Sequence, residues 1–158
     1  MKFINSSYED FIKNRKEKRI IQFGVSSAWH YYRKVFPNIV NNVVDYTLFT
    51  VDNKSSKQGQ EFVVEDRHIA IKSVEAIKRE QKYSILIMVS LAYQKEICAQ
   101  LLSLGLPDEI ECYSLPLMTY SFCPADNTCV NQYFSTHTIP VIKPIIHTFW
   151  FSGEEKTK

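Results

Sequence analysis

The hydrophobic positions of this chain fall into short continuous runs that are separated by longer segments with helical spacing. Five runs predict buried strands, because each has strand length and is bounded by turn residues. In chain order they are residues 19–23, 46–51, 68–72, 84–89 and 109–113. Residues 62–64 are a further, shorter strand candidate.

Four segments outside these runs are predicted to be helices, and the first and the last carry apolar residues on one face, which is typical of amphipathic helices. They are residues 7–18, 28–36, 73–80 and 93–104. Ser7 and Asp10 have capping-box spacing at the start of the first segment, and Gly105 is placed to end the last one. Pro37 is expected to end the second helix.

Strands that alternate with helices predict an α/β fold with a parallel sheet and right-handed crossovers. We expect a Rossmann-like three-layer sandwich with strand order 3-2-1-4-5. In that order the chain reverses direction between strands one and four, so the ligand crevice should lie at their carboxyl ends. The predicted domains are 1–114, the Rossmann-like nucleotide-binding-type domain with its N-terminal helix, 115–138, an irregular linker or packing segment, and 139–158, a last apolar stretch.

The composition is that of a globular protein, and it argues against some classes of partner. A net charge of +2 gives no general reason to expect a nucleic acid. No apolar run is long enough to cross a bilayer. The four cysteines are scattered and follow no signal peptide, so we expect reduced thiols and a cytoplasmic location.

The basic residues between positions 13 and 19 gather toward the end of the first predicted helix. Positive charge at that position complements the helix dipole, which favours a solvated helix end. A membrane-surface or phosphate-binding patch is the alternative.

The turn after strand one is the first candidate site. Gly24, Ser26 and Ser27 precede a predicted helix, whose first backbone amides could hold a phosphate. Asp52 ends strand two, where a carboxylate can accept hydrogen bonds from ribose hydroxyls, and Asn53 stands beside it.

Ser90 and Tyr93 follow strand four and should line the same crevice, although Ser90 could equally serve as a helix cap. The sequence shows no catalytic constellation and no metal motif of the D-x-D or H-E-x-x-H type. Cys123, Cys129 and His137 fit no common zinc spacing. We therefore predict neither catalytic nor metal-ligating residues.

The glycine-rich dinucleotide fingerprint is only partly present. Its three glycine positions are occupied by Gly24, Ser26 and Trp29. The bulk of Trp29 stands where a glycine normally lets the helix approach the strand, which disfavours NAD in its usual pose. The cofactor is left open, with a nucleotide or nucleotide sugar as the candidate.

Three segments together resemble the Rossmann-like modules of bacterial polysaccharide-biosynthesis proteins. These modules carry F-G-x-G-x-x-G, then V-D-N with a later K-x-G, then Y-x-E-I-x-x-x-L-x-x-x-G. The corresponding positions are residues 20–28, residues 51–53 with Lys57 and Gly59, and residues 85–89 with Tyr93, Glu96, Ile97, Leu101 and Gly105. Two residues, where the pattern has one, separate Tyr93 from Glu96.

Residues 143–153 resemble the I-P-K-I-I-H-Y-x-W-F-G-G opening of capsular-polysaccharide and mannosyltransferase-like glycosyltransferases. This resemblance implies a nucleotide-sugar donor, a metal held by a D-x-D motif, and a place for Trp150 in the nucleotide pocket. Because no D-x-D occurs before Lys158, we expect an N-terminal, non-catalytic module of a longer glycosyltransferase whose C-terminal catalytic domain is missing. The resemblance makes residues 139–158 the first strand of that truncated domain.

Two other hypotheses remain. One is an NAD-dependent oxidoreductase or epimerase acting on nucleotide sugars, and the other is a purely structural interaction domain. The expected partners are a nucleotide or nucleotide-sugar ligand and the catalytic domain, with a homo-oligomer left open.

Overall fold

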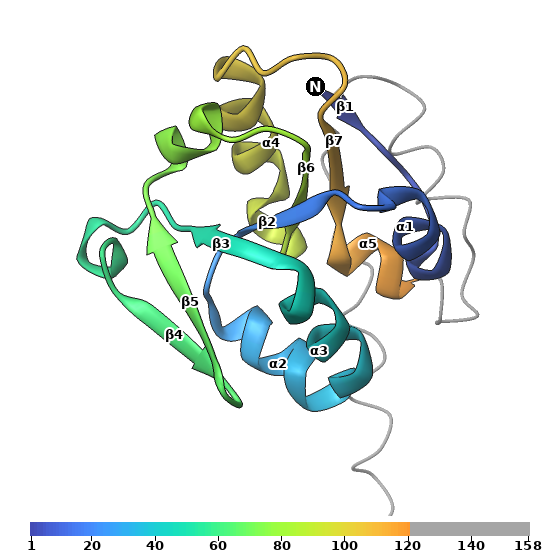
Figure 1. The fold of residues 1–158 in the computed structure, drawn as a ribbon, viewed down its shortest axis with the longest axis vertical. Coiled ribbons are helices and arrows are strands. Elements are labelled where there is room, and N and C mark those ends of the chain that lie inside the picture. The colour runs from blue at the N-terminus through green and yellow to red at the C-terminus, as the bar shows by residue number, and fades with distance from the viewer. Residues whose placement is uncertain (121–158) are drawn as a thin grey trace, which may run out of the picture.

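A seven-stranded sheet forms the middle layer of residues 1–120, the part of the chain that the structure, a computed structural model, describes. Its order is β1-β7-β6-β2-β3-β5-β4 (Figure 1). The strands are β1 (Lys2–Phe3), β2 (Arg19–Phe23), β3 (Thr47–Val51), β4 (Glu61–Val64), β5 (Arg67–Lys72), β6 (Tyr83–Ile87) and β7 (Glu111–Ser114). All neighbours pair in parallel except β4 and β5. This confirms an α/β fold with a mostly parallel sheet.

The strand order differs from the predicted 3-2-1-4-5, because the sheet has an additional strand at each edge. Strand β1 pairs with β7, and β4 forms an antiparallel hairpin with β5. Two residues are too few to give β1 a recognisable hydrophobic period, so it was not predicted. Between the edges the chain runs outward from β2 through β3 to β5 and returns to β6 on the other side of β2.

Helices cover both faces of the sheet (Figure 1). The α-helices of the described residues are α1 (Tyr8–Arg15), α2 (Ser27–Val35), α3 (Pro37–Tyr46), α4 (Gln94–Ser103) and α5 (Leu115–Tyr120). Three 3-10 helices accompany them within the same range, namely η1 (Ser55–Lys57), η2 (Val74–Arg79) and η3 (Leu91–Tyr93). The cap predicted for α1 is confirmed, since Ser7 Oγ accepts a hydrogen bond from the Asp10 amide at 3.1 Å.

Three helical segments depart from the predictions. Helix α2 ends at Val35, before Pro37 as predicted, but Pro37 also begins α3, a helix that was not predicted and in whose first turn the missing amide hydrogen costs nothing. The valines of α3 have low helix propensity, and their burial against the sheet outweighs it. Residues 73–80 form the 3-10 helix η2 instead of an α-helix, and α5 occupies the start of the segment predicted to be irregular.

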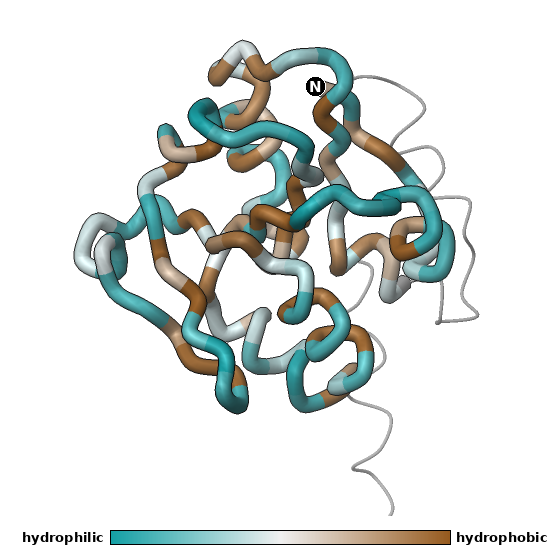
Figure 2. The backbone as a smooth tube through the Cα atoms, viewed as in Figure 1, coloured by the Kyte–Doolittle hydropathy of each residue, from teal (hydrophilic) through white to brown (hydrophobic). Residues whose placement is uncertain are grey.

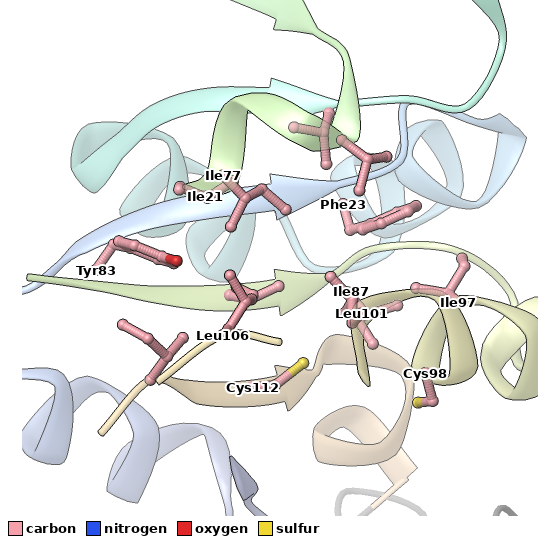
Figure 3. Packing of buried hydrophobic residues seen from close by; sticks show 14 of the residues in the cluster. Ile21, Phe23, Ile77, Tyr83, Ile87, Ile97, Cys98, Leu101, Leu106 and Cys112 are labelled. Atoms are coloured by element: carbon pink, nitrogen blue, oxygen red, sulfur yellow. The ribbon is translucent and has the colours of Figure 1, made fainter. Parts of the chain in front are cut away.

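The core has one apolar cluster on each face of the sheet. On one face, Ile97 and Leu101 of α4 and Ile77 of η2 pack against Ile21 and Ile87 of the strands (Figure 3). The other cluster lies beneath α1, α2, α3 and α5. Hydrophobic residues follow the central strands and alternate with hydrophilic residues along the surrounding helices (Figure 2). The sheet is therefore buried on both faces, as continuous apolar strands require.

The basic residues near the end of α1 are largely used inside the fold. Arg15 is 4% exposed, its guanidinium lies 3.2 Å from the Tyr46 ring centroid, and it donates a hydrogen bond to the Lys18 carbonyl at 3.0 Å. The Lys18 ammonium pairs with Glu111 at 2.8 Å, and Arg19 donates to the Tyr46 carbonyl at 3.2 Å. Three of the five basic residues therefore have partners within the fold, and the other two, Lys13 and Lys16, are exposed.

Candidate functional site

The candidate crevice lies where β2, β3 and β6 end. Gly24 follows β2, and its amide donates to the Val51 carbonyl at 2.8 Å. Gly24 has a φ of +98°, and a Cβ at this position would lie 2.2 Å from Val89 Cγ1. The glycine is thus required by its own backbone and by the chain that leaves β6, whatever ligand the loop holds.

Asp52 sits at the end of β3, as predicted, but its carboxylate is engaged by the chain itself. Only 8% of the residue is exposed. Its Oδ2 accepts hydrogen bonds from the Val25 amide at 3.1 Å and from the Lys57 ammonium at 2.9 Å. Its Oδ1 accepts from the Lys54 amide at 2.9 Å. A ribose hydroxyl would therefore have to compete with three internal donors.

Lys57 completes this arrangement, because its ammonium also donates to the Val25 carbonyl. The Asp52–Lys57 ion pair thus holds both backbone polar groups of Val25, the amide through the carboxylate and the carbonyl through the ammonium. The sequence pointed to Lys57 only as part of the V-D-N…K-x-G resemblance. Its position five residues after Asp52, in a polar turn, was the available signal.

Hydrogen bonding controls the ionisation of Asp52. Burial raises the pKa of its carboxyl group, but hydrogen bonds from the Lys54 amide, the Lys57 ammonium and the Val25 amide outweigh burial, so the pKa is lowered from its usual value. The folded state therefore favours the carboxylate over the neutral acid.

An Asp52→Asn substitution is expected to lower the free energy of unfolding at neutral pH by about 1–3 kcal/mol, because partly buried donors lose a charged acceptor. The lowered pKa means that the contribution of Asp52 is present above the unfolded-state value of about 3.9 and is lost as the pH falls below it. Urea unfolding of both proteins at pH 7 and at pH values below 4 should show the difference shrinking with acidity.

Asp45→Asn is the matched control for this measurement. Asp45 pairs with Arg67 at 3.1 Å, but both side chains are more than half exposed. Its loss should change the unfolding free energy at pH 7 by less than about 1 kcal/mol. Equal effects of the two substitutions at pH 7 would contradict the structural role of Asp52.

Asn53, also predicted for the crevice, faces α4. Its amide exchanges two hydrogen bonds with the amide of Gln100, each at 2.9 Å. The pair links the loop after β3 to the helix that covers one face of the sheet. The sequence offers no signal for this contact, since the two residues lie 47 positions apart.

Ser26 and Ser27 begin α2 at the crevice, as predicted. Ser26 occupies the N-cap position, but its Oγ is buried and has no hydrogen-bond partner among the described residues. Ser27 is exposed, and the first turn of α2, which the structure describes in full, contains no acidic side chain. The positive end of this helix dipole is therefore not neutralised by its own first turn.

Ser90 and Tyr93 bound η3, which follows β6. The Ser90 carbonyl accepts a hydrogen bond from the Tyr93 amide at 3.1 Å, while its side chain makes no capping hydrogen bond within the described residues. Tyr93 is 60% exposed. Trp150, the remaining predicted site residue, lies outside the described residues, as do Cys123, Cys129 and His137.

Trp29 belongs to the core. It is 1% exposed, its ring centroid lies 5.1 Å from that of Phe62, and its Nε1 donates to Gln22 Oε1 at 3.2 Å. Gln22 Nε2 in turn donates to Thr47 Oγ1 at 2.6 Å. The third glycine position of the fingerprint is thus filled by a side chain that joins α2 to the sheet.

The remaining reactive side chains also have structural surroundings. Cys98 and Cys112 are buried free thiols, and burial raises the pKa of Cys98 to about 11 and the pKa of Cys112 well above its usual value. Neither is an activated nucleophile. In residues 1–120 no group of three histidine, cysteine, aspartate or glutamate side chains is placed to hold a metal ion.

None of the helices in the described part of the chain combines the length and apolar character needed to cross a membrane. No protein-family model matches the chain, and no curated protein matches it either. A function must therefore be argued from the geometry of the crevice and from the motif resemblance.

Proposed function

We propose that this chain is the N-terminal, non-catalytic, Rossmann-like module of a cytoplasmic bacterial glycosyltransferase that builds capsular or other surface polysaccharide. In this proposal the module positions the enzyme, and sugar transfer depends on a C-terminal catalytic domain beyond Lys158. The motif resemblance of residues 20–105 and 143–153 supports the family.

The observation that carries the non-catalytic role is the state of Asp52. Its carboxylate is the group that a nucleotide ribose would need, and three donors of the chain itself already occupy it. The Val89 side chain likewise fills the space beside Gly24. The crevice is therefore built as a packed junction, which favours a positioning role.

An NAD-dependent oxidoreductase or epimerase is less well supported. It would require the first turn of α2 to approach the sheet closely at the third fingerprint position. Trp29 occupies that position, where its ring packs against Phe62 and its Nε1 donates a hydrogen bond to Gln22.

The test compares the 158-residue chain with the chain extended to the natural stop codon. Each is incubated with radiolabelled UDP-, GDP- and CDP-sugars and Mn²⁺, and transfer to a polysaccharide acceptor fraction is measured. We expect transfer only by the extended chain, and its loss when the D-x-D motif in the extension is changed to alanine. Turnover by the 158-residue chain, or an extension without D-x-D, would overturn the proposal.

A second candidate function is binding of a nucleotide or nucleotide sugar by this module itself. The first turn of α2, which has no acidic side chain of its own, favours it, since helix amides attract phosphate. A ligand at a hundred times its dissociation constant should stabilise the chain by about 2.7 kcal/mol, which raises the melting temperature by several degrees.

Ser27→Glu tests this second function without disturbing the core. A carboxylate in the first turn stabilises a helix but repels phosphate, so any thermal shift should disappear while the fold remains intact. Ser27→Gln is the neutral control. A thermal shift that survives Ser27→Glu would place the ligand elsewhere. If no nucleotide produces a thermal shift, the second function is wrong and only the positioning role remains.

A further inference from the structure

The segment from Asn53 to Gln60, which we call the strap, joins β3 to β4 and contains η1. Within the described structure none of its side chains is buried. Hydrogen bonds at both ends hold it in place. At one end Asn53 pairs with Gln100, and at the other the Gly59 amide donates to the Ile71 carbonyl at 2.8 Å.

Between these ends the strap is fastened to the crevice by polar contacts. The Lys57 ammonium reaches Asp52 and the Val25 carbonyl, and Gln58 Nε2 donates to the Asp52 carbonyl at 2.9 Å. The Lys54 amide donates to the Asp52 carboxylate. These four contacts are partly buried, and the strap itself buries no side chain. Segments that bury few apolar groups open locally at a lower free energy than the core.

We infer that the strap is a latch, which opens as a unit when Lys57 leaves Asp52 and Val25 and thereby uncovers the Asp52 carboxylate and the chain entering α2. The closed latch withholds Asp52 from any ligand that must bind this carboxylate. Such a ligand would bind only the open fraction, and its apparent affinity would fall by that fraction. This conformational role goes beyond the proposed positioning function and does not depend on it.

Two groups of amides distinguish a latch from a rigid loop. The Val25 and Lys54 amides both donate to Asp52 and depend on the latch. The Gly24 amide donates to the Val51 carbonyl and the Met88 amide donates to the Phe23 carbonyl. Both bonds lie in the sheet region and do not depend on the latch. In native-state hydrogen exchange, the first pair should exchange together and at least tenfold faster than the second pair.

Lys57→Met should accelerate exchange of the Val25 and Lys54 amides about tenfold or more and leave the Gly24 and Met88 amides nearly unchanged. Methionine keeps most of the length of the side chain, being one atom shorter, and removes its charge. Lys54→Met is the matched control, because Lys54 lies in the same strap and its side chain makes no ion pair among the described residues. It should leave all four amides as in the unmodified chain.

Two results would overturn the latch. In one, the Val25 and Lys54 amides of the unmodified chain exchange only as slowly as the Gly24 and Met88 amides. In the other, Lys57→Met accelerates all four amides equally, which would show a global loss of stability. Neither result depends on sugar transfer or nucleotide binding, so the latch and the proposed function can fail separately.

Discussion

A Gly24→Ala substitution should destabilise the chain by about 2–5 kcal/mol, because backbone strain and overpacking add at this position. The φ of +98° is one that L side chains rarely adopt. The added methyl group would also lie 2.2 Å from Val89 Cγ1, far inside the contact distance of two carbon atoms. Urea unfolding followed by circular dichroism measures the loss.

Gly59→Ala separates the two causes. Gly59 has a φ of +84°, but a Cβ there meets no atom within 4 Å, so only backbone strain of about 1–2 kcal/mol is expected. Combining Gly24→Ala with Val89→Ala removes the clash and should recover part of the loss, with a coupling energy of about 1–2 kcal/mol. If Gly24→Ala lowers the unfolding free energy no more than Gly59→Ala does, the close approach of Val89 is not what requires a glycine at position 24.

Trp29→Ala should cost about 3–5 kcal/mol, the range typical of a buried aromatic residue reduced to a methyl group. The substitution removes the ring that packs against Phe62 and leaves the Gln22 side-chain oxygen without its donor. Both effects act at the contact between α2 and the sheet. Urea unfolding should show a lower midpoint. The slope of the unfolding free energy against urea concentration tests whether the unfolded state has changed as well.

Two variants make this test specific. Tyr31→Ala changes an aromatic residue of the same helix that is 50% exposed, so it should cost well under half as much. Trp29→Phe keeps much of the ring but loses the hydrogen bond to Gln22, and it should fall between the other two. A Trp29→Ala loss no larger than that of Tyr31→Ala would contradict the assignment of Trp29 to the core.

Hydrophobic periodicity alone established the middle of the fold. Buried strands such as β2 and β6 give short, mostly apolar runs, and Ser7 provides a local cap for α1, so these elements follow from neighbouring residues. The edges of the sheet do not follow from neighbouring residues. The two residues of β1 have no period of their own, and α3 forms from β-branched residues only because the sheet beneath it buries them.

The same division applies to the crevice. The sequence established that Gly24 and Asp52 end neighbouring strands, because parallel strands bring their carboxyl ends to one edge. Only the tertiary structure decided what these residues do there. Asp52 meets the Val25 amide 27 positions away, Asn53 meets Gln100, and Val89 fills the space beside Gly24. Such partners are set by the register and twist of strands distant in the chain, which no local pattern of residues encodes.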